Sequence, residues 1–244
     1  METPFGSLSN HESVLNDSVQ AADSTGAEGL VASEENMIPV LELQPSTCAI
    51  FVHAWLTNHW RKIVNEQFVQ IGACGLASEA EITVGAIGDP GPLNELSAVC
   101  SSAQAKLLTF GNDPAQFEFP TLERLRVYAE SHEGYVCYLH TKGVSQPTVP
   151  LHDYWRRTMM DFVVVRWREC VAALHAGASV AGVRWRSTKR EWPHIFAGNF
   201  WWARCDYVRA LPGFNRSTRY GAEDWILSGH PRRIFEHRVP KPLI

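Results

Sequence analysis

An uninterrupted apolar run that ends abruptly in polar and charged side chains constrains this chain most. Residues 134–139 read Gly-Tyr-Val-Cys-Tyr-Leu, and they are followed directly by His140, Thr141, Lys142 and Gly143. A short, continuous apolar run predicts a strand that is buried on both faces, as strands of parallel sheets are. Open α/β sheets bind their ligands beyond the carboxyl ends of such strands. The run therefore predicts an α/β fold with hydrogen-bond donors and positive charge at one edge of its sheet.

Apolar runs alternate with amphipathic segments along most of the chain. Strands are expected at residues 47–53, 81–87, 106–110, 135–139, 178–183 and 195–202. Helices are expected at residues 60–71, 120–129, 154–175, 205–211 and 223–227. This alternation predicts a three-layer α/β/α domain without an internal boundary.

Local signals set the expected ends of these elements. Thr57 or Asn58 is expected to cap the first helix, and Thr121 the helix that begins near Pro120. The residues 88–92, Gly-Asp-Pro-Gly-Pro, predict a turn after the second strand. No helix is expected between this turn and the third strand.

The amino-terminal segment differs from the rest in charge and in periodicity. Residues 1–45 hold eight Asp or Glu and no Lys or Arg, while the remaining residues hold 18 acids against 22 bases. We expect residues 1–44 to form a disordered acidic tail and residues 45–244 to form a single domain. The small positive surplus of that domain suits a ligand such as a nucleotide diphosphate. It is too small for a dedicated nucleic-acid binder, so no nucleic-acid partner is expected.

Cysteine spacing and the lack of targeting signals indicate the compartment. The six cysteines lie far apart and form no Cys-x-x-Cys pair, which predicts reduced thiols and no zinc site. The amino terminus has neither the basic and apolar regions of a signal peptide nor the arginines of a transit peptide. No apolar stretch reaches the roughly 18 residues that span a bilayer. A soluble, cytoplasmic protein without a transmembrane segment is expected.

Several motifs follow one another in a specific order. Tyr-Leu-His-Thr-Lys-Gly-Val-Ser begins at Tyr138, Trp-Arg-x-x-Met at Trp155, His-x-x-x-Gly-Asn-Phe-Trp-Trp-Ala at His194, and Ala-Glu-x-Trp-Ile at Ala222. Over residues 47–237 this order resembles a family of glycosyltransferase-like proteins. The resemblance implies a GT-A-type fold with a mixed, mostly parallel sheet, and a nucleotide-binding half followed by an acceptor-binding half. It also implies transfer of a hexose from a nucleoside-diphosphate sugar to a hydroxyl of a glycan or glycoconjugate.

The same resemblance suggests how the donor diphosphate is held. Most GT-A enzymes place an Asp-x-Asp motif after the central strand to hold Mn²⁺ or Mg²⁺, whereas this chain has His140, Thr141 and Lys142 there. Lys142 is expected to neutralise the diphosphate as a point charge, and His140 to bind phosphate or a metal ion. His237 resembles the late histidine that completes the metal site in some relatives. Dependence on Mn²⁺ or Mg²⁺ therefore stays open.

Two further residues are candidates for donor binding. Arg156, at the start of the long helix, either adds charge opposite the diphosphate or belongs to a solvated first turn. Asp89, after the second strand, either meets the ribose or base or belongs to a plain turn.

Glu223 and Asp224 resemble the acidic pair that supplies the catalytic base in many inverting glycosyltransferases. Adjacent residues of a helix point about 100° apart, so only one of the two can face a cleft. Glu223 is the expected base, because the motif places it after Ala222. The alternative is an acid that is favoured at a helix amino terminus by the helix dipole.

The acceptor site is expected at the third motif. His194 and Asn199 are the hydrogen-bonding candidates, and Trp201 and Trp202 offer faces on which sugar rings stack. Successive side chains of a strand point to opposite faces, so at most one of the two tryptophans lines the acceptor cleft.

The missing Asp-x-Asp motif supports a second interpretation. On that interpretation, the chain is a non-catalytic module that binds carbohydrate or nucleotide sugar on a degenerate transferase scaffold. A nucleotidyltransferase is a weaker third interpretation, because residues 53–58 lack the Gly-rich basic loop of that class.

Overall fold

A computed structural model describes residues 48–146, 149–183, 185–186, 195–196 and 198–237. The acidic tail expected at residues 1–44 lies outside the described residues. None of the helices in the described segments has the length and hydropathy that crossing a bilayer requires.

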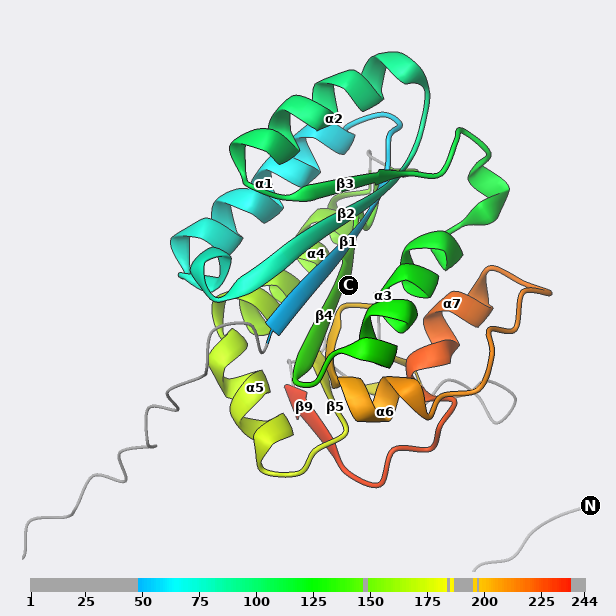
Figure 1. Cartoon of the computed structure of the whole chain (residues 1–244). Coiled ribbons are helices and arrows are strands. Elements are labelled where there is room, and N and C mark those ends of the chain that lie inside the picture. Colours follow the sequence, from blue (N-terminus) through cyan, green and yellow to red (C-terminus); the bar gives the residue numbers. More distant parts are fainter. Residues whose placement is uncertain (1–47, 147–148, 184, 187–194, 197, 238–244) are drawn as a thin grey trace, which may run out of the picture. The chain divides into compact units, whose positions relative to one another are not determined.

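A seven-stranded mixed sheet forms the centre of the described domain (Figure 1). Its strand order is β3-β2-β1-β4-β8-β5-β9, and β8 runs antiparallel to β4 and β5 while the other neighbours are parallel. The strands are β1 (Cys48–Trp55), β2 (Ala80–Ile87), β3 (Lys106–Thr109), β4 (Tyr135–His140), β5 (Val180–Val183), β8 (Trp201–Arg204) and β9 (Ile234–His237). A two-stranded ribbon pairs β6 (Trp185–Arg186) with β7 (Ile195–Phe196). The expected mixed, mostly parallel sheet is confirmed.

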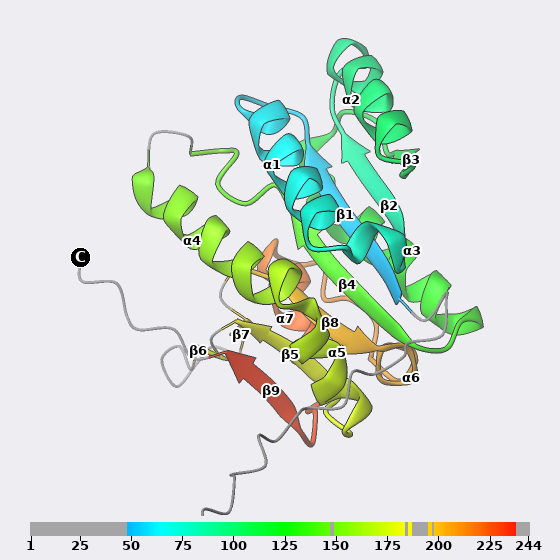
Figure 2. The ribbon, with the colours of Figure 1, turned by 90° about the vertical axis from the view of Figure 1, so that its left-hand side faces the viewer.

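Helices cover both faces of this sheet (Figures 1 and 2). One face carries α1 (Trp60–Ala73), α2 (Pro90–Ser102), α4 (Pro150–Met160), a π-helical segment (Asp161–Val165) and α5 (Trp167–His175). The other carries α3 (Phe119–Ser131), α6 (Cys205–Arg209) and α7 (Tyr220–Asp224). Short 3₁₀ turns lie at Leu76–Ser78, Pro114–Gln116 and Trp225–Leu227. Alternate residues of β1 enter separate cores, Ile50 and Val52 on one side and Ala49 and Phe51 on the other. The three-layer architecture is confirmed.

The strand order changes direction between β1 and β4. From β1 it adds β2 and β3 on one side, and β4 then pairs with the opposite edge of β1. His53 and His140 are partners in the β1–β4 register, close to the carboxyl end of each strand. Ligand crevices of open α/β sheets form at such a switch point.

Helix α2 was not expected from the sequence, and the turn predicted at residues 88–92 is wrong. Pro90 opens the helix, with Asp89 in extended conformation as its N-cap. Proline fits the first helical position because its φ is preset and its missing N–H has no partner there. The same Pro-Gly cluster therefore starts a helix rather than closing a loop.

The caps of two expected helices also differ from the prediction. His59 rather than Thr57 or Asn58 is the N-cap of α1. Glu118 rather than Thr121 is the N-cap of α3, and Thr121 is buried in the first turn, where its hydroxyl lies 2.8 Å from Nδ1 of His53. Asn58 and Thr121 use their side chains in tertiary contacts instead.

Two long elements expected from periodicity are divided. The helix expected at residues 154–175 starts at Pro150 and is interrupted by the π-helical segment, where the carbonyl of Val163 accepts a 2.7 Å bond from Nε1 of Trp202. The strand expected at residues 195–202 becomes β7 and β8, because Gly198 and Asn199 adopt φ of 90° and 58°. A left-handed pair of residues turns the chain and ends a strand.

Candidate active site

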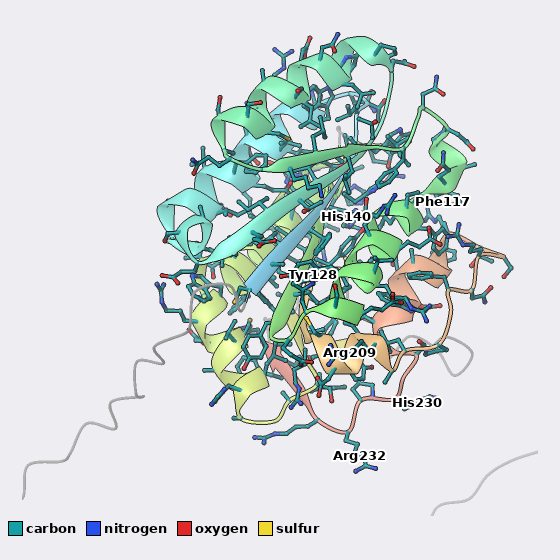
Figure 3. All side chains as sticks on the ribbon, viewed as in Figure 1. Phe117, Tyr128, His140, Arg209, His230 and Arg232 are labelled. Atoms are coloured by element: carbon teal, nitrogen blue, oxygen red, sulfur yellow. The ribbon has the colours of Figure 1, made fainter. Side chains whose placement is uncertain are left out.

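A pocket of about 600 Å³ opens at the carboxyl ends of β1, β2 and β4. Its walls include residues from strand ends, from the loop after β3, from the loop after β4 and from α7. Its lining residues include His53, Trp55, Phe117, Glu118, His140, Thr141, Lys142, Arg219 and Glu223. Figure 3 shows His140 and Phe117 toward this end of the sheet, whereas Arg209, His230 and Arg232 lie toward the other end.

The loop after β4 is fixed at its start by β1. The amide of Thr141 donates to the carbonyl of His53 at 3.0 Å, and the Thr141 hydroxyl accepts from the amide of Trp55 at 3.1 Å. Thr141 is 3% exposed. Thr141 lines the pocket as expected, but these contacts make it a residue that joins two strand ends.

Polar side chains of two helices hold the rest of this loop. Gln67 of α1 donates to the carbonyl of His140 at 3.0 Å, and Asn58, just before α1, donates to the carbonyl of Val144 at 2.9 Å. Arg156 of α4 donates to the carbonyl of Lys142 at 3.2 Å. Because its carbonyls are bonded on both sides of Gly143, the loop presents Lys142 to the pocket from a fixed backbone.

His140 lines the pocket, yet both of its ring nitrogens face protein oxygens. Nε2 lies 2.9 Å from the carbonyl of Gly198, and Nδ1 lies 3.4 Å from Oε1 of Glu118. Burial, with a smaller effect of Lys142, lowers the pKa of His140 to about 4. The ring is therefore neutral at pH 7, and it donates through Nε2 because a carbonyl oxygen only accepts. This geometry does not support the direct phosphate contact expected of His140.

His53 is a second buried histidine of the pocket. It is 4% exposed, and burial is the main reason that its pKa falls to about 4, with a smaller raising effect of Glu118 and a lowering effect of His140. The Thr121 hydroxyl beside its Nδ1 fits because Gly85 of β2 has no side chain: a Cβ there would lie 2.2 Å from Oγ1 of Thr121. Both buried histidines of the pocket are thus neutral at pH 7.

Glu223 lines the pocket from α7, and Asp224 does not. Burial, together with the neighbouring Glu223, raises the pKa of Asp224 above its ordinary value. Only one of the adjacent acids faces the cleft, which is what the helical spacing predicts. Arg219 lies one helical turn before Glu223 and lines the same pocket. Its guanidinium lies over the Tyr220 ring.

Arg156 belongs to neither of the environments expected for it. It is 3% exposed, and its guanidinium bonds Glu66 at 3.0 Å and Asp153. It therefore supports the loop at Lys142 rather than facing a diphosphate. Asp89 is exposed, accepts a 3.2 Å bond from Asn112, and is not among the lining residues.

Three of the four residues expected to bind an acceptor are buried, and the fourth lies outside the described residues. Asn199, Trp201 and Trp202 are all 0% exposed, and none of them lines the pocket. Trp201 and Trp202 enter opposite cores, as strand alternation predicts. Direct contact of these three residues with a ligand is not supported, because no surface of theirs is accessible. His194 lies outside the described residues.

The residues proposed for a metal ion do not fit one site. His140 faces the α3 side of the sheet, whereas His237 lies beside Cys170 and Phe162 on the opposite side. Burial lowers the pKa of His237. In the described segments no three His, Cys, Asp or Glu side chains converge as metal ligands. These residues therefore do not form a site for the Mn²⁺ or Mg²⁺ that the resemblance implies.

Glu118 joins several polar residues of the site, although nothing in its local sequence marked it as a candidate. Its side chain is 16% exposed, and its Oε2 accepts from the Tyr138 hydroxyl at 2.9 Å and from Nδ2 of Asn199 at 2.7 Å. Arg219 was missed as well, since nothing in its local sequence separates it from a surface arginine. His53 could have been found by the rule that selected His140, because it too is a polar residue near the end of an apolar strand.

A family model matches residues 49–216 of the chain, and it is described as a domain of unknown function (DUF8361). The chain belongs to this family. The match includes the loop after β4, β8 and Arg216, and it ends before Arg219 and Glu223. No curated protein matches the chain.

Solved structures with a similar arrangement include two kinds of protein. S. aureus TarS 1–349 is 10% identical, with a TM-score of 0.44, over 78% of this chain and 58% of that chain. A putative nucleotide-diphospho-sugar transferase from Desulfovibrio desulfuricans G20 is 12% identical, with a TM-score of 0.44, over 79% of this chain and 80% of that chain. TarS 1–349 in complex with UDP gives a TM-score of 0.42 at 10% identity, over 79% of this chain and 60% of that chain. The chain thus spans less than two thirds of TarS 1–349, and these likenesses assign it no activity.

Proposed function

We propose that this protein is a glycosyltransferase that moves a hexose from a nucleoside-diphosphate sugar to a hydroxyl of a glycan or other acceptor. One observation carries the proposal: Lys142, Arg219 and Glu223 line a single pocket at the switch point of the sheet. Cations can stabilise the departing diphosphate, and a carboxylate can accept the proton of the acceptor hydroxyl. The motif order of the sequence supports the same conclusion.

Lys142 and Arg219 are proposed to stabilise the leaving diphosphate. Lys142 extends from a loop whose backbone is bonded to α1, α4 and β1, so the start of its side chain is held at the pocket before the reaction. Preorganised charges of this kind favour the transition state because they need no reorganisation when negative charge develops. No step of this proposal is assigned to a metal ion.

Glu223 is proposed to be the general base. In an inverting transfer, the acceptor oxygen attacks the anomeric carbon and loses its proton to the Glu223 carboxylate. The bond from that carbon to the diphosphate oxygen breaks, and the diphosphate leaves with the electron pair. In a retaining transfer, Glu223 instead orients the acceptor.

Trp55 and Phe117 are proposed to provide the apolar wall for the nucleobase or sugar. Phe117 is 41% exposed, has φ of 49°, which is unusual for a large side chain, and lines the pocket. An exposed aromatic side chain at a pocket offers a stacking face. We further propose that residues 45–244 act as one catalytic domain in the cytoplasm.

A turnover assay separates this enzyme from a binding module. The protein is incubated with UDP-, GDP-, ADP- and CDP-linked hexoses, with and without Mn²⁺, and the release of nucleoside diphosphate is followed. At least one donor should be turned over, and Glu223→Gln should slow release roughly 100-fold, because general bases contribute 10²–10⁴-fold. Glu130→Gln, which removes an exposed carboxylate of α3, is the control and should leave the rate unchanged.

The binding module is the second candidate, because the described residues offer neither an Asp-x-Asp motif nor a converging set of metal ligands. Donor binding that is weakened by Lys142→Ala, without turnover of any donor across a panel of acceptors, would establish the module and reject the transferase.

A further inference from the structure

Glu118 occupies a helix N-cap but does not cap the helix. As the N-cap of α3, its side chain makes no hydrogen bond to the first turn. A carboxylate at this position ordinarily accepts from the backbone N–H groups of the second or third helical residue. Here the side chain points away from the helix and into the site, where 16% of its surface is exposed. Its interactions therefore serve another part of the molecule.

The Glu118 carboxylate joins two segments that are distant in sequence. Its Oε2 accepts from the Tyr138 hydroxyl on β4 at 2.9 Å and from Nδ2 of Asn199 at 2.7 Å. Its Oε1 faces Nδ1 of His140 at 3.4 Å, but the neutral ring carries its proton on Nε2, so Nδ1 has none to donate. The short contacts are thus at Oε2, and they tie β4 to the turn before β8.

Asn199 extends this connection to α7. Besides Glu118, its Nδ2 lies 3.4 Å from the carbonyl of Ala222, and its Oδ1 accepts from Nε1 of Trp201 at 2.8 Å. The residue is 0% exposed and is held at φ of 58° after a glycine at φ of 90°. Ala222 immediately precedes Glu223, so the amide of Asn199 bridges the Glu118 carboxylate and the backbone that carries the proposed base.

We propose that Glu118 is a positioning residue: through Asn199, its carboxylate fixes the backbone of α7 and thereby the place of Glu223 in the pocket. This inference rests on the proposed function for its consequence in catalysis, but the positioning itself can be measured without turnover. Glu118 does not take the proton and does not bind the diphosphate in this scheme.

Hydrogen–deuterium exchange of the full chain tests the positioning directly. Amides of residues 220–227 should exchange several-fold faster in Glu118→Ala and in Asn199→Ala than in the wild type. Glu118→Gln should stay near wild type, since its amide oxygen still accepts from Tyr138 and Asn199 while its NH₂ faces Nδ1 of His140. Glu123→Ala is the matched control, because it removes an exposed carboxylate from the same helix. Unchanged exchange at residues 220–227 in Glu118→Ala would overturn the proposal.

Kinetics and binding then separate positioning from general destabilisation. With a donor that the wild type turns over, Glu118→Ala should lower kcat roughly 50-fold, because small misplacements of a reacting group can cost 10²-fold. The Kd for the nucleoside diphosphate should stay within about twofold, and Glu118→Gln should restore most of kcat. The double variant Glu118→Ala/Asn199→Ala should be hardly worse than either single variant, because both break one connection.

Two outcomes would contradict the inference in different ways. If Glu118→Ala loses nucleoside-diphosphate binding and thermal stability together and Glu118→Gln does not restore them, the residue is merely structural. If the exchange result holds but the wild type turns over no donor, the positioning stands and the proposed transferase fails.

Discussion

His53 and His140 are register partners on β1 and β4, and both are neutral at pH 7. Burial lowers the pKa of each to about 4, and each also lies near the other's ring, which for His53 adds to the lowering. His140 donates through Nε2 to Gly198, and His53 contacts Thr121 through Nδ1. The switch point of the sheet therefore carries two neutral imidazoles in a pocket to which Lys142 and Arg219 bring positive charge.

These two histidines should make the protein less stable in weak acid. Their folded-state pKa of about 4 lies below the ordinary histidine value of 6.5, so the unfolded chain binds more protons between these values. The free energy of unfolding should therefore fall as the pH drops from 6.5 to 4, by on the order of 3 kcal/mol per histidine.

Urea unfolding at pH 7, 6, 5 and 4.5 measures this effect. His53→Gln should lose clearly less stability over that interval than the wild type, whatever its stability at pH 7. Parallel stability curves for the two proteins would show that His53 does not titrate as the structure implies.

Lys142→Ala and Arg219→Ala should each weaken the binding of nucleoside diphosphate about tenfold, or about 1.4 kcal/mol. Each variant removes one of the two cations that the described part of the chain contributes to the pocket. Calorimetric titration with UDP, GDP, ADP and CDP measures the Kd, and the wild-type affinity should decrease with added salt. Arg232→Ala, at the opposite end of the sheet in Figure 3, is the matched control. An equal loss in Arg232→Ala would mean that overall charge, not this pocket, binds the ligand.

Arg156→Ala should destabilise the fold by about 3 kcal/mol, since removing one partner of a buried ion pair leaves the others uncompensated. It also removes the donor to the carbonyl of Lys142. Because Arg156 lowers the pKa of Asp153, the loss should be largest above the ordinary pKa of that carboxyl and smaller in acid.

Urea unfolding at pH 7 measures this loss as well. Arg156→Lys should recover little, because an ammonium cannot reproduce the forked contacts of the guanidinium. Arg157→Ala, an exposed neighbour on the same helix, should change stability by less than about 1 kcal/mol. Similar losses in Arg156→Ala and Arg157→Ala would contradict the assignment of Arg156 as the support of the loop.

Gly221→Ala should displace α7 and reduce turnover together with stability. A Cβ on Gly221 would lie 1.7 Å from the carbonyl oxygen of Asn215, so the backbone has to move. Overpacking of this kind costs about 1–3 kcal/mol. Thermal unfolding and kcat measure the two effects. Gly213→Ala, where a Cβ meets nothing within 4 Å, should leave both near wild type. Normal turnover in Gly221→Ala would mean that Glu223 tolerates a shift of its helix.

The sequence by itself determined most strands of the sheet, although not β9 at Ile234–His237, and the polar groups at one strand end. A continuous apolar run needs burial on both faces, so its end at His140 had to lie at a sheet edge, with Lys142 just beyond it. The spacing of Glu223 and Asp224 likewise decided that one acid faces away from the pocket. These are consequences of local periodicity, and they do not depend on which segments pack together.

Only the tertiary structure decided what the remaining polar residues do. Arg156, Asn199 and Glu118 find their partners far along the chain, at Glu66, Ala222 and Tyr138 respectively. Their pattern in the sequence is the same whether they face solvent, a ligand or one another. A buried polar side chain requires a partner, and the partner is set by how the layers pack, so no local pattern could show which partners these residues take.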